Sequence, residues 1–354
     1  MWSYTKRLPD VFVSYLRGES TPILNLVQIR EDDRRYTSDD CVTMKVYLNR
    51  RSFLLAGTGL SATFVLPKNF FGSHKKSLLV FTKSSGFEHD VVKTIDGHPS
   101  LVDNAVTALG KKYGFEVMPS KDGRIFDSKE FHDFGAVLFY TSGYLTNVGK
   151  DGNPAMTPQG KKTLLDAINN GIGFVGIHAS TDSFHTLPDP DDRSNRYIAH
   201  GEQSDPFIHM QGGEFIIHGS TPRLQAAKVI VNDPGFPGLE GVTSPVNYTQ
   251  EWYSLKDFTP DLHVILTLDT HGMTGEPYQR PPYPVTWARM QGKGRVFYTA
   301  IGDRPEDWTD PFFLNLLAGG IRWTLGDVAA SPSKNLVQVA PGYAVIPPRA
   351  GQER

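Results

Sequence analysis

Cysteine is nearly absent from this sequence, since only Cys41 occurs among 354 residues. One thiol forms neither an internal disulfide nor a zinc–thiolate cluster. Long hydrophobic runs are also lacking: the main candidate covers about 14 mildly apolar residues, whereas a membrane-spanning helix needs about 20. Neither sign of charge dominates, because 36 Lys and Arg stand against 38 Asp and Glu and leave a net charge of −2. We therefore expect no membrane span and no surface that binds nucleic acid through its phosphates.

A basic pair followed by a short apolar stretch marks the N-terminal part. Arg50-Arg51-Ser52-Phe53-Leu54 leads into a Gly- and Ala-rich segment that ends near residue 66. This order is typical of a signal peptide, and the Arg-Arg-x-Phe-Leu form resembles a twin-arginine export signal. The alternative is a buried strand or helix that happens to follow two arginines. The export interpretation places the protein in the periplasm or otherwise outside the cytoplasm.

Four segments follow from this interpretation. A chain that started at Met44 would have only a short basic segment before the arginine pair. We therefore interpret residues 1–43 as an upstream extension from a misassigned start. Residues 44–75 are then a signal peptide and linker, and residues 76–326 are a single folded domain. About 250 residues suit one α/β domain. Residues 327–354 are rich in Pro and Ala, and we expect them to form an unstructured tail.

Short buried apolar runs alternate with amphipathic helical patterns between residues 76 and 177. Such alternation is typical of a doubly wound α/β fold, a mostly parallel sheet with helices on both faces. Thr157 and Asp310 each precede a proline and predict helix starts. The expected strands are residues 76–82, 115–118, 136–140, 173–177, 213–218, 226–232, 263–268, 285–290 and 295–300, and the expected helices are residues 99–109, 157–170 and 310–324.

Polar side chains gather directly after several of these predicted strands. In doubly wound sheets, ligands bind beyond the carboxyl ends of the strands. His89 follows the first strand, His178 the fourth and Asp303 the last. Tyr144 and Asp182 stand close behind the third and fourth strands. Two histidines at matching strand ends favour one shared site at this edge of the sheet.

Six motifs occur in order along the predicted domain. They are Phe87-x-His89, Gly173-Phe174-Val175-Gly176-Ile177-His178-Ala179-Ser180-Thr181-Asp182, Gly212-Gly213-x-Phe215-x-x-His218, Glu251-Trp252-Tyr253, Pro284-Val285-x-Trp287 and Gly292-x-Gly294-Arg295-Val296-Phe297-Tyr298-Thr299. Together they resemble the ThuA-like, or trehalose utilisation, family over about residues 76–326. The resemblance implies a class I glutamine amidotransferase-like, flavodoxin-like fold. It also implies a role in the bacterial handling of trehalose-like disaccharides and their oxidised keto forms.

The missing thiol excludes amidotransferase chemistry. That fold normally carries a cysteine nucleophile on a strained turn after a strand, and the matching turn here begins with His178. A thiolate mechanism is therefore ruled out. Ser180 is a poor substitute, because the Gly-x-Ser-x-Gly elbow is absent. The chain also departs from the family after the last strand, where Gly302-Asp303 replaces the usual Gly-His, and this exchange alters charge and ligand preference.

Two mechanisms remain open for the catalytic candidates, which are His178, Glu251, His89 and Asp303. In the first, three histidines and Glu251 hold a divalent metal such as zinc, which suits imidazole and carboxylate ligands. The histidines would be His89, His178 and His218. In the second, His178 and Glu251 act as acid and base without a metal. Purely structural hydrogen bonding is the third reading of the same residues.

The expected ligand is a small carbohydrate, as the resemblance implies. Aromatic side chains pack against the apolar faces of pyranose rings, so some of the aromatic residues are candidates for binding it. The substrate-binding candidates are Tyr144, Trp287, Trp252 and Asp182. Core positions are the alternative for both tryptophans. The sequence favours an exported sugar-processing enzyme, with a non-catalytic carbohydrate-binding or accessory protein as the competing interpretation, and it carries no signature of oligomeric state.

Overall fold

The computed structural model divides the chain into two units, Met1–Ser73 and His74–Arg354. Residues 76–186 and 194–349 are described with their side chains, and five strands of the first unit are described as backbone. These strands form a three-stranded antiparallel sheet and a separate antiparallel pair where an extension and a signal peptide were expected; Arg50 and Arg51 lie outside the described residues. The strands are β1 (Ser3–Leu8), β2 (Val11–Arg17), β3 (Pro22–Gln28), β4 (Cys41–Lys45) and β5 (Thr63–Pro67).

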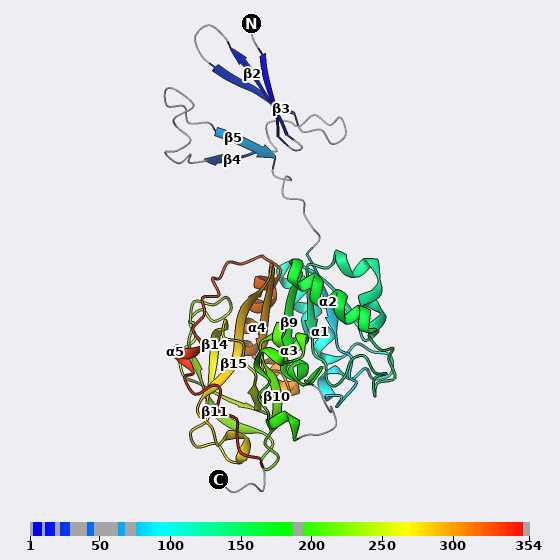
Figure 1. Cartoon of the computed structure of the whole chain (residues 1–354), viewed down its shortest axis with the longest axis vertical. Coiled ribbons are helices and arrows are strands. Elements are labelled where there is room, and N and C mark those ends of the chain that lie inside the picture. Colours follow the sequence, from blue (N-terminus) through cyan, green and yellow to red (C-terminus); the bar gives the residue numbers. More distant parts are fainter. Residues whose placement is uncertain are drawn as a thin grey trace. The chain divides into compact units, whose positions relative to one another are not determined.

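A nine-stranded sheet forms the centre of the second unit (Figure 1). Five neighbouring strands run parallel and are β6 (Ser77–Phe81), β7 (Glu116–Ser120), β8 (Ala136–Phe139), β9 (Gly173–Ile177) and β16 (Gly294–Thr299). Their spatial order is β7-β6-β8-β9-β16. Counted along the chain this is the order 2-1-3-4-5, which is that of flavodoxin-like doubly wound sheets. The predicted α/β fold is confirmed.

Four antiparallel strands extend this sheet beyond β16, so that the whole sheet is mixed. In order from β16 they are β15 (Tyr283–Gln291), β14 (His263–Asp269), β11 (Gln225–Val231) and β12 (Val246–Gln250). Only Gly292 and Lys293 separate β15 from β16, and a parallel pair would need a crossover of about a dozen residues or more. A separate antiparallel pair consists of β10 (Glu214–His218) and β13 (Tyr253–Lys256). The sequence did not predict β12 or β13.

Successive residues of the inner parallel strands β6, β8 and β9 are all buried or nearly so, and those of β6 pack alternately into two different cores. Leu78 and Val80 of β6 join one core, while Leu79 and Phe81 join the other. The first core includes buried residues of α1 (Leu101–Tyr113) and α4 (Pro311–Thr324), and the second includes those of α2 (Pro158–Asn170) and α3 (Pro206–Gln211). Helices therefore cover both faces of the sheet, as predicted.

The predicted helix starts are also confirmed. The side chain of Thr157 accepts a hydrogen bond from the Gly160 N–H at the start of α2, and that of Asp310 accepts one from the Phe313 N–H at the start of α4. Each cap satisfies a backbone donor that the first turn of a helix leaves unpaired. No helix among the described residues is long and apolar enough to cross a bilayer.

The C-terminal segment differs from the expected unstructured tail. Residues 327–349 pack against the domain and contain the short helix α5 (Leu336–Val339), with Leu336 and Ala340 buried. The side chain of Asn335 accepts a hydrogen bond from the Val264 N–H at 2.6 Å and donates one to the Val264 carbonyl at 3.1 Å. Composition misled the prediction, because this proline-rich segment packs apolar side chains against the core and accepts hydrogen bonds from Arg280 and Trp323 of the domain.

Replacing Leu336 tests whether this segment belongs to the fold. We expect Leu336→Ala to lower the free energy of unfolding by about 2–5 kcal/mol, because the side chain is fully buried and its loss leaves a cavity. The matched control is Val337→Ala, one residue along and 60% exposed, which should change stability by no more than about 0.5 kcal/mol. Urea denaturation measures both. Equal effects would contradict the packing of α5.

Candidate active site

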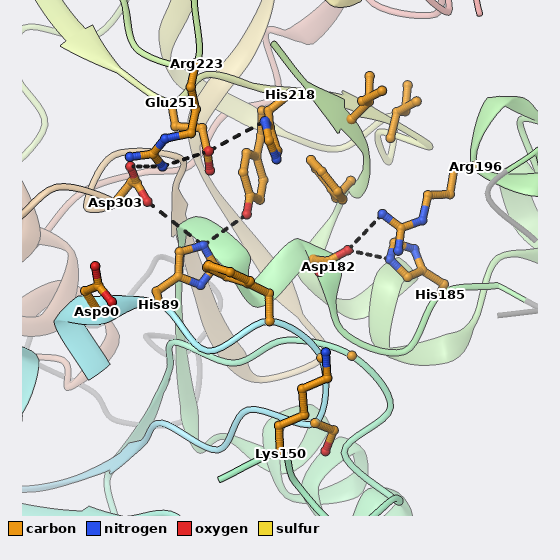
Figure 2. Close-up of a pocket in the computed structure, with 18 of the residues that line it drawn as sticks. His89, Asp90, Lys150, Asp182, His185, Arg196, His218, Arg223, Glu251 and Asp303 are labelled. Carbon is orange, nitrogen blue, oxygen red and sulfur yellow. Dashed lines mark hydrogen bonds and ion pairs between the residues drawn. The ribbon is translucent and has the colours of Figure 1, made fainter. Parts of the chain in front are cut away.

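The carboxyl ends of the parallel strands carry the predicted site residues to one edge of the sheet. His89 lies in the loop after β6, His178 directly follows β9 and Asp303 comes after β16. Glu251 reaches the same place from the antiparallel part, between β12 and β13. Figure 2 shows Glu251 and Asp303 on the same side of the pocket as His89. The structure brings together all four residues that were named as catalytic candidates.

Hydrogen bonds between the loops hold this edge in register beyond the strand ends. The N–H groups of Ser85 and Gly86 donate to the carbonyl of Ser142 at 2.9 and 3.0 Å. The Gly143 N–H donates to the carbonyl of Asp182 at 2.8 Å. Gly143 has a φ of +74°, and a Cβ there would lie 2.4 Å from the backbone nitrogen of Gly86. Only glycine permits so close an approach of the two loops.

His178 occupies a strained turn immediately after β9. Its φ of 42° lies in the left-handed region, which costs a residue other than glycine about 1–3 kcal/mol. Its carbonyl accepts hydrogen bonds from the hydroxyls of Thr181 at 3.1 Å and Tyr298 at 2.9 Å, and these bonds stabilise the turn. Its Nδ1 lies 2.9 Å from the carbonyl oxygen of Ala300. Because a carbonyl only accepts, Nδ1 carries the proton and Nε2 is the nitrogen that faces the other site residues.

Four donor groups converge at one wall of a pocket. The Nε2 of His178 lies 3.4 Å from Glu251 Oε2 and 3.9 Å from Asp303 Oδ1, and the Nε2 of His89 lies 4.0 Å from the same Asp303 oxygen. One ligand atom from each of the four residues lies within 4.8 Å of all the others. His178 Nε2 is buried and has no hydrogen-bond partner among the described residues. Such an orphaned nitrogen is typical of a site that receives a ligand.

Arg223 holds the two carboxylates from the outer side. Its NH1 donates to Glu251 Oε1 at 2.9 Å and to Asp303 Oδ2 at 3.1 Å. These are the oxygens that do not face His178, so each carboxylate divides its two oxygens between the arginine and the imidazole. Sequence reasoning missed Arg223, because an arginine in a polar loop between two strands has no spacing that marks it.

The surroundings of these four side chains shift their pKa values in different directions. Burial, reinforced by the neighbouring His178, lowers the pKa of His89 to about 3, so this imidazole is neutral. Burial would raise the pKa of Glu251, but His178, His218 and Arg223 outweigh it and lower the value to about 2. Burial raises the pKa of Asp303 against the opposing attraction of His178. For His178 itself, burial lowers the pKa, yet Glu251 and Asp303 bring the net shift upward.

A pocket of about 1100 Å³ opens in front of this group. His89, Glu251 and Asp303 line it, as do the predicted substrate-binding residues Tyr144 and Asp182. Aromatic rings occupy much of the remaining wall, namely Phe87, Tyr197, Phe215 and Tyr253. Phe87 is 65% exposed, and its ring lies edge-on to that of His89 with centroids 4.9 Å apart. The pocket therefore offers both charged groups and apolar faces, which is usual for small-molecule sites.

Trp252 and Trp287 do not line this pocket, and their interpretation as substrate-binding residues is corrected. Both are completely buried. The indole N–H of Trp252 donates to the Gln225 carbonyl, and that of Trp287 donates to the Gln211 carbonyl. The ring of Trp287 also stacks on Tyr298 at 4.2 Å between centroids. With their only polar groups satisfied internally, both are core residues.

His218 lines the pocket but lies outside the four-donor group. Its Nδ1 faces the carbonyl of Gly219 at 2.8 Å and lies 3.5 Å from Glu251 Oε1, and its side chain is 36% exposed. The four-donor group consists of two histidines and two carboxylates, and His218, predicted as a metal ligand together with His89 and His178, is not one of them. Asp303, the departure from the family pattern, is one of the two carboxylates.

A second cluster of charged side chains adjoins the pocket and is internally neutralised. His200, Glu214 and Asp257 have the donor atoms of a metal site. The buried Nζ of Lys256 lies among them, 2.9 Å from Glu214 and 2.8 Å from Asp257. It also contacts the His200 Nδ1 at 3.2 Å. The lysine ammonium already supplies the cation that this cluster requires.

His185 connects this cluster to the pocket. One ring nitrogen lies 2.7 Å from Asp182 Oδ1 and the other lies 2.8 Å from Glu214 Oε1 (Figure 2 shows the Asp182 contact). Two carboxylates can each accept from the ring only when both nitrogens carry protons. Burial lowers the pKa of His185, but these two partners outweigh it and raise the pKa above its usual value. A charged imidazole therefore stabilises this wall.

A neutral replacement of His185 should weaken the fold most at low pH. The stabilisation from the charged ring is fully present below about pH 6.5 and is lost as pH rises through the raised folded-state pKa. We expect His185→Gln to lower the free energy of unfolding by about 1.5–3 kcal/mol at pH 6 and by less at pH 9. Urea denaturation at both pH values measures the difference. The control His98→Gln, at an exposed position, should leave the free energy of unfolding nearly unchanged at both pH values. A destabilisation by His185→Gln that grows with pH would contradict the charged state of His185.

This chain resembles a known protein family over most of its length. A family model described as trehalose utilisation, ThuA, matches residues 77–324. The chain belongs to the ThuA family. The match spans the described sheet, its helices and all four site residues. No curated protein matches the chain.

Solved structures resemble this ThuA chain at low sequence identity. A ThuA-like protein from Bacteroides uniformis is 18% identical, with a TM-score of 0.49 over 73% of this chain and 95% of its own. A ThuA-like protein from Parabacteroides merdae is 16% identical, with a TM-score of 0.45 over 77% of this chain and 96% of its own. A cytoplasmic protein from Salmonella typhimurium is 9% identical, with a TM-score of 0.42 over 70% of this chain and 98% of its own.

Proposed function

We propose that this ThuA-family chain processes a trehalose-like disaccharide or its keto-glycoside in the pocket beside His89, Glu251 and Asp303. The observation that carries the proposal is the convergence of four acid, base or ligand groups at one wall of a pocket of about 1100 Å³. The family description supplies the substrate class. The exposed ring of Phe87 and the ring of Tyr144 supply faces against which a pyranose can pack.

The pKa shifts of the site residues suggest a different role for each of them. Glu251, with a pKa near 2, is a weak base and serves best as a fixed negative charge that stabilises positive charge on His178. His178 and Asp303 have pKa values shifted upward, which suits proton transfer near neutral pH. Because His178 Nδ1 donates its proton to the Ala300 carbonyl, Nε2 is the nitrogen that can gain or lose a proton. A divalent metal held by the same residues would polarise a sugar carbonyl or activate water.

The competing function is carbohydrate binding without turnover. The sequence feature that favours this alternative is Asp303, which replaces the histidine usual in the family. In the structure, Asp303 joins His178 and His89 at 3.9 and 4.0 Å rather than leaving a gap. The replacement therefore preserves a donor at this position, and this favours the enzymatic proposal.

Turnover of 3-keto-trehalose is the direct test. Wild-type protein should convert it, and Glu251→Gln should lower kcat by about 10²- to 10⁴-fold, because the neutral amide removes the charge that stabilises protonated His178. The control Glu240→Gln, an exposed carboxylate outside the pocket, should leave kcat unchanged. Chromatography of the products measures the rate. Saturable binding of the sugar with no turnover would establish the binding protein instead.

We also propose export through the N-terminal signal. The support is the Arg50-Arg51-Ser52-Phe53-Leu54 pattern and the apolar stretch that follows it.

An arginine-to-lysine exchange tests this export. Changing Arg50 and Arg51 to lysine in the full chain should hold the protein in the cytoplasm, because twin-arginine export requires the pair itself. The chain contains a second pair, Arg34-Arg35, whose exchange to lysine is the matched control and should leave export intact. Immunoblots of periplasmic and cytoplasmic fractions measure both. Normal export of the Arg50/Arg51 variant would refute the proposal.

A further inference from the structure

The site residues at the strand ends have the arrangement of a preformed cation site. We propose that His89, His178, Glu251 and Asp303 bind one divalent transition-metal ion at the wall of the pocket. The proposal goes beyond the sugar assignment, because it concerns the affinity of these residues for a metal and stands or falls without any turnover. Three independent features carry it: the donor atoms, their supports and an orphaned nitrogen.

The donor atoms point inward from four separate segments. Glu251 Oε2 and Asp303 Oδ1 face His178 Nε2 at 3.4 and 3.9 Å, and His89 Nε2 faces the same Asp303 oxygen at 4.0 Å. A tetrahedral ion with bonds of about 2.0 Å needs ligand atoms about 3.3 Å apart. These three distances exceed this by less than 1 Å, and all four ligand atoms lie within 4.8 Å of one another, so side-chain movements of about 1 Å would bring them to bonding distance.

Supporting groups hold the ligands in orientation. Arg223 binds the outer oxygen of each carboxylate, at 2.9 Å for Glu251 and 3.1 Å for Asp303, and leaves the inner oxygens to the ion. The Ala300 carbonyl accepts from His178 Nδ1 at 2.9 Å and leaves Nε2 as the ligand nitrogen. Metal-binding histidines and carboxylates commonly have such partners, which fix the tautomer and the direction of the lone pairs.

The orphaned nitrogen indicates that a partner belongs in the site. His178 Nε2 is buried and makes no hydrogen bond within the described residues, although two carboxylates lie nearby. A buried polar group without a partner costs about 1–3 kcal/mol, and a bound cation would remove that cost. The neighbouring cluster differs in where its cation lies: the buried Lys256 Nζ lies between Glu214 and Asp257, whereas Arg223 contacts Glu251 and Asp303 only through the oxygens that do not face His178 Nε2.

The ligand types favour zinc or a similar first-row ion over calcium or magnesium. Two imidazoles with two carboxylates suit Zn²⁺ and its neighbours, whereas Ca²⁺ and Mg²⁺ prefer oxygen ligands alone. One existing contact competes with the ion: the Tyr253 hydroxyl lies 3.3 Å from His89 Nε2. A bound ion would take this lone pair in place of the Tyr253 hydroxyl.

Calorimetric titration of the chelator-treated full chain with Zn²⁺ is the test, with Co²⁺ absorption spectra reporting imidazole and carboxylate ligation. We expect one saturable site per chain. Glu251→Gln and Asp303→Asn should weaken Zn²⁺ binding at least 100-fold, because each removes a charged ligand. Arg223→Gln should weaken it by about 10- to 100-fold, as expected for an outer partner.

Two variants make the test specific. His218→Ala removes a histidine that lines the same pocket but stands outside the four ligands, and it should bind Zn²⁺ as the wild type does. Tyr253→Phe frees His89 Nε2 and should bind Zn²⁺ at least as tightly as the wild type. Thermal unfolding without metal verifies that each variant folds. The proposal is refuted if folded wild type binds no Zn²⁺, if Glu251→Gln and Asp303→Asn both bind normally, or if His218→Ala loses binding equally. Sugar turnover by metal-free protein would support the proposed function without a metal. The metal proposal would still be decided by the Zn²⁺ titration.

Discussion

The contact between His178 Nδ1 and the carbonyl oxygen of Ala300 is the interaction on which the arrangement of the site depends. It joins the end of β9 to the end of the adjacent parallel strand β16, and it decides which imidazole nitrogen carries the proton. Without it, the strained backbone of His178 would still place the ring near Glu251 and Asp303 but would not fix the nitrogen that faces them. The cost of the left-handed turn is offset by the hydroxyls of Thr181 and Tyr298.

The same parallel-strand edge explains why residues far apart in sequence meet. β6, β9 and β16 run in one direction, so the residues that follow them reach one edge together. The antiparallel extension then contributes what the parallel strands lack. Its β12 ends immediately before Glu251, and the loop before β11 carries Arg223. The mixed sheet thus surrounds the site from two sides: the parallel strands contribute His89, His178 and Asp303, and the antiparallel extension contributes Glu251 and Arg223.

Burying two carboxylates beside each other is expensive unless their charges are balanced. Glu251 and Asp303 are both nearly inaccessible, and Arg223 and His178 are the positive or protonatable groups that contact them. Losing either partner would leave uncompensated negative charge in a region of low dielectric. The wall around His185 solves the same problem with different cations, because Lys256 contacts both Glu214 and Asp257 and His185 contacts Glu214 as well. Two neighbouring acidic clusters therefore differ in whether an internal lysine occupies the centre.

The sequence alone was enough for the fold class, the strand ends and three of the four clustered residues. Short, mostly apolar strands separated by amphipathic helices favour a doubly wound sheet, and this topology carries whatever follows each parallel strand to one edge. His89, His178 and Asp303 came from that rule, whereas Glu251 came from the resemblance of its motif. Trp252 and Trp287, Arg223 and the C-terminal segment needed the tertiary structure. Whether an indole faces a pocket or the core, which carboxylate oxygen an arginine takes, and whether a proline-rich segment packs all depend on contacts between distant parts of the chain, and local sequence does not encode such contacts.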